Sequence, residues 1–430
     1  MNKIKENILS EINEIKIIDS HEHILEEGEA LKTRRDLFNL FSQYAFRDLM
    51  LAGMDSNEAE LLFNKNFPLE LRWKLFHPYW DKIKYTCYSK CILRSIKKFY
   101  GYSDLKEDNY KDISLALEEN YKPGIYRKVL RDTCNIEKAL TQLLTTKVDK
   151  NKDDPILIPV MPLALGCGRL LGTWEEFQYY GPDDYWGFSE KWDYKTRTLN
   201  NIDDCLDSQK EYLKKIKEEG SVGVKFLTFP KANLESEPDR KLAVEIFNDF
   251  KTGKIKNLTH PNELTNYLMD NAIKSAVKEG FVIAIHTGYW GDFRELSPLN
   301  IIQLIKRNPE GIFDLYHLGY PWIRESINIA KQFPNVYINF CWLHIVSQRA
   351  GNWALDEVVE TIPINKVSAF GGDFQAENIE NIWGHLEMAK ENLADVFAKK
   401  ISQGWMDQSE AIEIIKKYLY ENPKSLYKLK

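Results

Sequence analysis

A β-branched run near the start of the sequence ends in two closely spaced histidines: Ile15-Lys16-Ile17-Ile18-Asp19-Ser20-His21-Glu22-His23. Successive side chains of a strand alternate between its two faces, so His21 and His23 are predicted to point the same way. Two imidazoles that project together from the C-terminal end of a strand form half of a metal site. The interpretation of this pair as metal ligands is strengthened because four later strand-like runs each carry a residue that could complete such a site.

The chain has the sequence pattern of a parallel α/β protein. Short apolar runs alternate with longer segments of helical periodicity, as in βαβ units. Eight of these runs are predicted to be strands: Ile15–Asp19, Ala139–Leu143, Ile156–Pro162, Gly223–Leu227, Phe281–Ile285, Ile312–Tyr316, Val336–Phe340 and Val367–Phe370. Eight parallel strands with intervening helices predict a (β/α)8 TIM barrel, which with insertions accounts for 430 residues as one domain over residues 1–430.

Two connections are too long for simple crossovers. Residues from about 26 to 133 are helical in pattern and rich in aromatic and basic side chains, which predicts a helical insertion after the first strand. Residues from about 169 to 200 follow the third strand and hold many Trp, Tyr and Phe residues. Long loops in compact proteins are usually functional or disordered, and this one is too aromatic for disorder. We therefore expect an aromatic lid loop there.

Composition excludes several classes of function. The net charge of −6 argues against a general nucleic-acid binder. The longest purely apolar runs have about five residues, far fewer than the roughly 20 that span a bilayer, so no membrane segment is expected. Residues 1–14 form a charged amphipathic pattern without the features of a secretory signal, which favours a cytoplasmic protein. Assembly as a homo-oligomer stays open.

Four polar residues stand within or directly after predicted strands. Lys225 lies inside the apolar run Gly223–Leu227, and the other three, His286, His317 and Asp373, follow later runs. Barrel active sites are built from the C-terminal ends of several strands. Taken singly, each residue has an ordinary structural explanation, such as a hydrogen-bonded histidine or a turn at Gly-Gly-Asp. Their joint occurrence in this order favours a metal site.

This ordered pattern resembles the amidohydrolase superfamily. Three segments look like its amidohydrolase-related, nodulin-like branch: His286-Thr287-Gly288, His317-Leu318-Gly319-Tyr320-Pro321-Trp322 and Gly371-Gly372-Asp373-Phe374. Two others resemble the divergent uronate isomerases: Phe46-Arg47-Asp48-Leu49-Met50-Leu51-Ala52-Gly53-Met54 and Asn422-Pro423. Uronate isomerases lack a histidine at the strand-six position, so His317 favours a hydrolase-type site.

The resemblance implies a ligand set of six residues: His21, His23, Lys225, His286, His317 and Asp373. It implies one or two divalent metal ions, with zinc favoured and manganese, iron or nickel open. Lys225 would bridge them if it carries the family's carbamate, because an ammonium group cannot ligate a cation. Asp373 is also the candidate general base and proton shuttle.

Four residues are candidates for contacts with a small-molecule substrate, for which a carboxylate is considered. Arg47 is the preferred carboxylate partner from the uronate isomerase likeness. Arg294 and Arg349 lie in predicted loops and could pair with a carboxylate, with surface salt bridges as the alternative. His344 follows the seventh strand, where a substrate contact and a structural hydrogen bond are equally supported.

The favoured function is a metal-dependent hydrolase that activates water to cleave an amide, ester or lactone bond in a small polar substrate. The alternatives are a uronate isomerase-like sugar acid isomerase and a metal-dependent decarboxylase. A degenerate barrel that binds a ligand without turnover is the non-enzyme alternative, and the intact ligand set argues against it. Fold membership alone does not select the reaction.

Overall fold

The structure is a computed structural model that describes residues 2–142, 155–167, 172–178, 198–226, 234–259 and 261–430. In this part of the chain, eight strands follow one another across a single sheet in the order β1 to β8. Their bounds are β1 Ile17–Glu22, β2 Ile136–Thr141, β3 Leu157–Pro162, β4 Gly223–Phe226, β5 Val282–His286, β6 Ile312–Tyr316, β7 Val336–Asn339 and β8 Val367–Ser368. The protein has the predicted (β/α)8 fold.

The chain divides into two compact units. The first comprises Met1–Thr141, Phe340–Glu360 and Ser368–Pro423, and the second comprises Gln142–Asn339, Thr361–Val367 and Lys424–Lys430. The expectation that residues 1–430 form one domain stays a prediction. No helix among the described residues is both long and apolar enough to cross a lipid bilayer.

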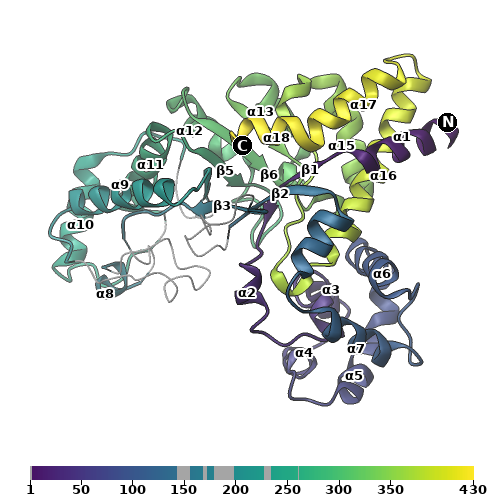
Figure 1. Cartoon of the computed structure of the whole chain (residues 1–430). Helices are drawn as coiled ribbons and strands as arrows, with labels where there is room; N and C mark the ends of the chain where they lie inside the picture. Colours follow the sequence, from purple (N-terminus) through teal and green to yellow (C-terminus); the bar gives the residue numbers. More distant parts are fainter. Residues whose placement is uncertain (1, 143–154, 168–171, 179–197, 227–233, 260) are drawn as a thin grey trace. The chain divides into compact units, whose positions relative to one another are not determined.

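The first unit contains the predicted helical insertion after β1. Its helices are α2 Glu27–Ala30, η1 Leu37–Phe41, α3 Ala45–Leu51, α4 Ser56–Phe63, α5 Leu69–Ile83, α6 Cys87–Tyr100, α7 Tyr110–Asn120 and η2 Arg127–Thr133. Figure 1 shows α3 to α7 gathered together. Together with η1 they enclose a separate hydrophobic core. In this core the Phe41 ring of η1 contacts the rings of Phe76 and Trp80 edge to face. Burial of such large aromatic surfaces stabilises the insertion.

Local signals fix the ends of these helices. Asp55 caps α4, where its side chain accepts hydrogen bonds from the Asn57 and Glu58 backbone N–H groups. Thr86 caps the start of α6, and Gly101 ends that helix in the left-handed conformation with φ of 83°. Asp and Thr are common at helix starts because their side-chain oxygens accept hydrogen bonds from the first free backbone N–H groups. Gly is common at helix ends because it adopts positive φ without steric cost.

The remaining helices of the first unit come from the two ends of the chain and from the segments around β8. They are α1 Asn2–Glu14, α14 Leu343–Val346, α15 Gln348–Thr361, η9 Ala376–Asn378, α16 Asn381–Ser402, α17 Gln408–Lys416, η10 Lys417–Glu421 and α18 Asn422–Leu426, of which α15 and α18 end in the second unit. The long helix α16 packs against both α1 and α6.

The second unit contains β3 to β7. Its helices are α8 Trp174–Phe177, α9 Ile202–Glu218, α10 Arg240–Lys251, α11 Glu263–Lys278, η6 Pro298–Ile301, α12 Ile302–Arg307, η7 His317–Gly319, α13 Ile323–Gln332 and η8 Ile364–Lys366. The strands pair in parallel, with Lys225 opposite Ala284 and His286 opposite Tyr316. The predicted lid over residues 169–200 lies largely outside the described residues.

Several predicted strand bounds were wrong by a few residues. The first strand continues past Asp19 because the Ser20 N–H still donates to the Phe370 carbonyl, at 3.2 Å between N and O. The last strand ends at Ser368 rather than Phe370 because the Ala369 N–H donates to Tyr418 on η10 instead of to a strand. The second strand begins at Ile136, where it pairs with Ile17, and not at Ala139.

Candidate metal centre

The first cluster of predicted ligands forms where β1 meets the segment that follows β8, within the first unit. The Asp373 N–H donates to the His21 carbonyl at 2.8 Å, and the His23 N–H donates to the Phe374 carbonyl at 2.9 Å. These backbone hydrogen bonds align the two segments side by side. They bring His21, His23 and Asp373 together although about 350 residues separate the histidines from the aspartate.

The side chains of these three residues converge. His21 Nε2 and His23 Nε2 each lie 3.1 Å from Asp373 Oδ1, and the possible ligand atoms of all three residues lie within 4.8 Å of one another. Donor atoms about 2.1 Å from a shared ion are separated by about 3.0 to 3.4 Å in octahedral or tetrahedral geometry. The observed spacing and the imidazole–carboxylate chemistry fit a divalent transition metal.

Two buried acids of β1 support the loop that carries Asp373. Asp19 Oδ1 accepts a hydrogen bond from the Gly372 N–H at 3.1 Å, and Glu22 Oε2 accepts one from the Phe374 N–H at 2.7 Å. Burial raises the pKa of Asp19 to about 6, and burial together with the charge of Asp19 raises the pKa of Glu22 well above its usual value. A Cβ atom at residue 372 would lie 1.9 Å from Glu22 Oε1, so only glycine fits there.

The backbone of Asp373 is strained and is held by the helical insertion. Its φ is 63°, a conformation that costs a non-glycine residue on the order of 1–2 kcal/mol. The Asp373 carbonyl accepts hydrogen bonds from the Tyr44 hydroxyl at 2.5 Å and from Gln43 Nε2 at 2.9 Å. Both donors stand just before α3. The insertion therefore helps to orient a candidate catalytic group.

A second pair of predicted ligands lies in the second unit. His286 ends β5 and His317 follows β6, and the distance from His317 Nε2 to His286 Nδ1 is 3.0 Å. His317 also has a positive φ, of 65°. Lys225 on β4 is fully buried, and its Nζ lies 3.8 Å from the centroid of the Tyr316 ring. The two histidine nitrogens have the separation of donors that share an ion.

A buried polar network in the second unit was not predicted. Asp314 Oδ2 on β6 accepts hydrogen bonds from the Tyr427 hydroxyl at 2.8 Å and from Asn339 Nδ2 at 3.0 Å. Tyr316 and Tyr427 are joined by a hydroxyl–hydroxyl contact of 3.0 Å. Burial raises the pKa of Asp314 to about 6. An acid inside the apolar run Ile312–Tyr316 was the available signal, whereas its partner Tyr427 is 113 residues away.

The four candidate substrate-binding residues are dispersed. His344 is fully buried, with Nε2 3.1 Å from the Ala369 carbonyl and Nδ1 2.9 Å from Asn392 Nδ2. This geometry favours the structural hydrogen bond, and a substrate contact of His344 stays a prediction. Arg294 is exposed and forms a bidentate ion pair with Asp292, which favours the surface alternative. Arg47 on α3 and Arg349 on α15 are exposed.

The residues that sequence reasoning missed around Asp373 are Asp19, Glu22, Gln43 and Tyr44. One signal was present for the two acids. Residues 19–23 are five polar residues in succession, so the strand lacks the alternation that a half-solvated strand shows. All six residues of β1 are buried. No local pattern marks Gln43 and Tyr44, because their role depends on a contact across about 330 residues.

Comparison with known proteins identifies the family of this chain. The sequence model of the family described as amidohydrolase matches residues 202–429. The chain belongs to the amidohydrolase family. Membership indicates an enzyme that depends on a metal ion. A curated relative, Protein fluG of Emericella nidulans, is 28% identical over 153 residues, which are 34% of this amidohydrolase and 17% of fluG. The chain thus spans only a small part of that relative.

Solved structures similar to this amidohydrolase share its fold. A glucuronate isomerase from Caulobacter crescentus has a TM-score of 0.76 and 16% identity, covering 99% of this chain and 94% of its own. A uronate isomerase from Thermotoga maritima has a TM-score of 0.72 and 16% identity, covering 99% and 98%. A protein assigned to the metal-dependent hydrolases from Lactobacillus casei has a TM-score of 0.61 and 18% identity, covering 97% and 96%.

Proposed function

We propose that this amidohydrolase is a hydrolase that cleaves an amide, ester or lactone bond in a small polar substrate. The observation that carries the proposal is the contact between His286 and His317, whose ring nitrogens lie 3.0 Å apart. The resemblance described above places a histidine at the position of His317 in hydrolases and not in uronate isomerases. The pair of imidazoles includes His286 on β5, the strand that pairs with the strand of Lys225, and it supports a second metal ion, which favours hydrolysis.

The proposed roles follow from the two ligand clusters. His21, His23 and Asp373 would hold one divalent ion, and His286 and His317 would hold another, with carbamylated Lys225 as a further ligand. Zinc suits this donor set best, with manganese, iron and nickel as alternatives. Such an ion acts as a Lewis acid on the scissile carbonyl and lowers the pKa of water from 15.7 to about 7.

Asp373 is the proposed general base and proton shuttle. It takes the proton of the attacking water and delivers it to the leaving group. The hydrogen bonds that Tyr44 and Gln43 donate to its carbonyl, together with the bond from its own N–H to His21, fix where its carboxylate points. Held in this way, the carboxylate needs little reorganisation when the proton moves.

The test is a substrate screen of the metal-loaded protein over lactones, N-acyl amino acids and uronates, followed by the variant Asp373→Asn. We expect turnover of the substrate found to fall by about 100- to 10,000-fold while metal content stays near normal. The matched control is Glu377→Gln, which makes the same chemical change on the neighbouring helix η9. Near-normal rates in Asp373→Asn would reject the proposed role of Asp373.

Isomerisation of a uronic acid is the second candidate. Arg47 lies in the segment that resembles uronate isomerases. It follows Tyr44 by about one helical turn of α3, and the Tyr44 hydroxyl donates to the Asp373 carbonyl. Its guanidinium could bind a substrate carboxylate. Decarboxylation stays the third alternative.

Product analysis separates the three reactions. Hydrolysis incorporates oxygen from labelled water, isomerisation leaves the substrate mass unchanged, and decarboxylation releases carbon dioxide. For an isomerase, Arg47→Gln should raise KM for uronates by about 10- to 150-fold, since a lost charge-assisted contact costs about 1.5–3 kcal/mol and each 1.4 kcal/mol is a factor of ten. Conversion of a uronate without a change of mass would reject the hydrolase proposal.

A further inference from the structure

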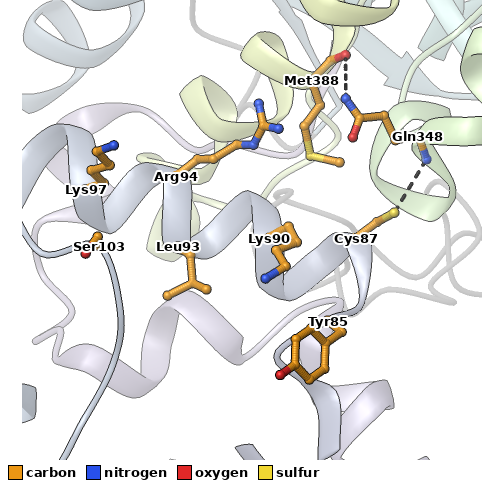
Figure 2. A pocket seen from close by; sticks show the side chains of 9 residues that line it. All are labelled: Tyr85, Cys87, Lys90, Leu93, Arg94, Lys97, Ser103, Gln348 and Met388. Carbon is orange, nitrogen blue, oxygen red and sulfur yellow. Dashed lines mark hydrogen bonds between the residues drawn. The ribbon is translucent and has the colours of Figure 1, made fainter. Parts of the chain in front are cut away.

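A cavity of about 420 Å³ lies in the first unit, outside the candidate metal centre. Figure 2 shows the nine side chains that line it, most of which come from α6 and its flanking residues. Its volume is within the roughly 300–1,000 Å³ of sites for small molecules. The cavity is large enough for an organic ligand and not only for a single inorganic ion.

The lining of this cavity is strongly basic although the protein as a whole has a net charge of −6. Lys90, Arg94 and Lys97 stand at positions i, i+4 and i+7 of α6 and therefore share one face of the helix. None of the nine lining residues is acidic. The chemistry of the lining thus selects an anion.

The three cations are not equivalent. Arg94 donates through both terminal nitrogens to Glu391, at 2.7 and 2.9 Å, so its charge is compensated and its planar fork is in use. Lys90 and Lys97 form no ion pair with a carboxylate within the described part of the chain. The two lysines therefore supply the net positive charge. Ser103 adds a hydroxyl donor.

The spacing of the two lysines indicates the shape of the ligand. Seven residues of an α-helix rise about 10 Å, so Lys90 and Lys97 stand toward opposite ends of the cavity. The apolar side chain of Leu93 and the thioether of Met388 line the space as well. These features fit a molecule with negative charge at both ends and a short carbon skeleton between them.

We propose that this cavity binds a small organic bisphosphate, with one phosphate at Lys90 and the other at Lys97. Phosphate is favoured over carboxylate because a phosphate ester carries nearly two negative charges and three acceptor oxygens, which match the compact, three-donor ammonium group of lysine better than a singly charged carboxylate does. The arginine of this cavity is already bound to Glu391. The proposal stands apart from the reaction at the metal centre.

Isothermal titration calorimetry of the full chain tests the proposal, with fructose 1,6-bisphosphate, fructose 6-phosphate and succinate as probes. The bisphosphate should bind, and the monophosphate should bind about tenfold more weakly, equal to the loss of one contact of about 1.4 kcal/mol. Lys90→Gln and Lys97→Gln should each weaken bisphosphate binding by about the same factor. Binding should weaken further as salt is raised.

Lys98→Gln is the matched control. Lys98 is the next residue of the same helix, and its Nζ lies 5.4 Å from the ring centroid of Trp383 and not in the cavity lining. This variant should bind the bisphosphate as the unmodified protein does. Equal weakening by Lys98→Gln would show general charge attraction and overturn the proposal. Absence of bisphosphate binding, equal affinity for the monophosphate or tighter binding of succinate would overturn it too.

Discussion

At the scale of single residues, Asp373 shows how far sequence reasoning reaches. Read together with the other strand-end residues, the segment Gly371-Gly372-Asp373 after an apolar run predicted a carboxylate near His21 and His23. The reason that this residue tolerates a φ of 63° could not be predicted. Its carbonyl is held by Tyr44 and Gln43, which are about 330 residues away and lie in no recognisable motif.

Removal of the Tyr44 hydroxyl should weaken the metal centre without disrupting the fold. Tyr44→Phe deletes one hydrogen bond to the Asp373 carbonyl and leaves the aromatic stack intact, so we expect a loss of about 1 kcal/mol in the free energy of unfolding. Disturbed support of a metal ligand typically lowers metal affinity by about 10- to 100-fold. Metal affinity measured by competition with a chelator checks this expectation.

Tyr88→Phe is the control for that prediction. Tyr88 stacks on Tyr44 with ring centroids 5.3 Å apart, so the change removes a hydroxyl from the same aromatic stack. It should change metal affinity by no more than about twofold, which corresponds to about 0.4 kcal/mol of binding free energy. Equal metal affinities of Tyr44→Phe and the unmodified protein would show that Asp373 does not depend on this hydrogen bond.

The buried His344 should make the free energy of unfolding depend on pH. Burial lowers its pKa from 6.5 to about 4, and the same cause lowers the pKa of His385 to about 3. The folded protein therefore keeps His344 neutral, whereas the unfolded chain takes up a proton below pH 6.5. The contribution of His344 to the free energy of unfolding is fully present above pH 6.5 and is lost as the pH falls toward 4, by about 3 kcal/mol.

The measurement is the free energy of unfolding in urea between pH 7 and pH 4. His344→Gln keeps an amide donor for the Ala369 carbonyl and cannot be protonated, so its stability should decline less steeply with falling pH. The slopes are compared because the substitution also changes stability at pH 7. His77→Gln, at an exposed position of α5, should leave the slope unchanged. Parallel slopes for His344→Gln and the unmodified protein would exclude His344 as the titrating group.

At the scale of secondary structure, strand and insertion were predictable and their exact ends were not. The run Ile312–Tyr316 matches β6 residue for residue, because it is mostly apolar and starts directly after Gly311. The ends of β1 and β8 depend on which backbone groups they meet, at Phe370 and at Tyr418, and such long-range partners leave no local trace. The helices of the insertion were visible from their periodicity, while their packing around Phe76 was not.

A buried ion pair anchors the insertion to the segment before α16. Arg35 Nη2 lies 2.5 Å from Glu380 Oε2, both side chains are almost fully buried, and the Tyr100 hydroxyl donates to Glu380 Oε1 at 2.7 Å. Removal of one charge of such a pair leaves the other buried and uncompensated, which costs about 3–5 kcal/mol. Arg35→Met should therefore lower the free energy of unfolding by about that amount, measured by urea titration.

The double variant Arg35→Met with Glu380→Leu tests the cause. Replacement of a whole buried ion pair by apolar residues of similar volume is often close to neutral. The double variant should therefore be more stable than Arg35→Met alone. A double variant less stable than the single one would show that the stability comes from the attraction itself and not from avoiding a buried lone charge.

At the scale of the whole molecule, the order of elements could be predicted, but the division of the predicted ligands between two units could not. The number and order of the strands follow from the alternation of apolar runs and helices, and they agree with β1 to β8. The predicted ligands fall into two compact units, His21, His23 and Asp373 in the first and Lys225, His286 and His317 in the second. Sequence spacing carries no information on that division, since residues 340–360 and 368–423 return to the unit of β1.

This division makes metal stoichiometry the decisive property of the whole molecule. If each ligand cluster holds its own ion, the protein purified gently should contain two metal ions per chain. His23→Ala should retain one ion and His317→Ala the other, because each change removes a ligand from one cluster only. Each ion that binds only the folded state adds about 2.7 kcal/mol at a hundredfold excess over Kd, so a chelator should lower Tm in the unmodified protein and less so in each variant. Elemental analysis of the dialysed proteins measures the content, with His77→Ala as a control that should keep both ions. A single ion lost from both His23→Ala and His317→Ala would reject two independent ions and return isomerisation and decarboxylation to equal standing with hydrolysis.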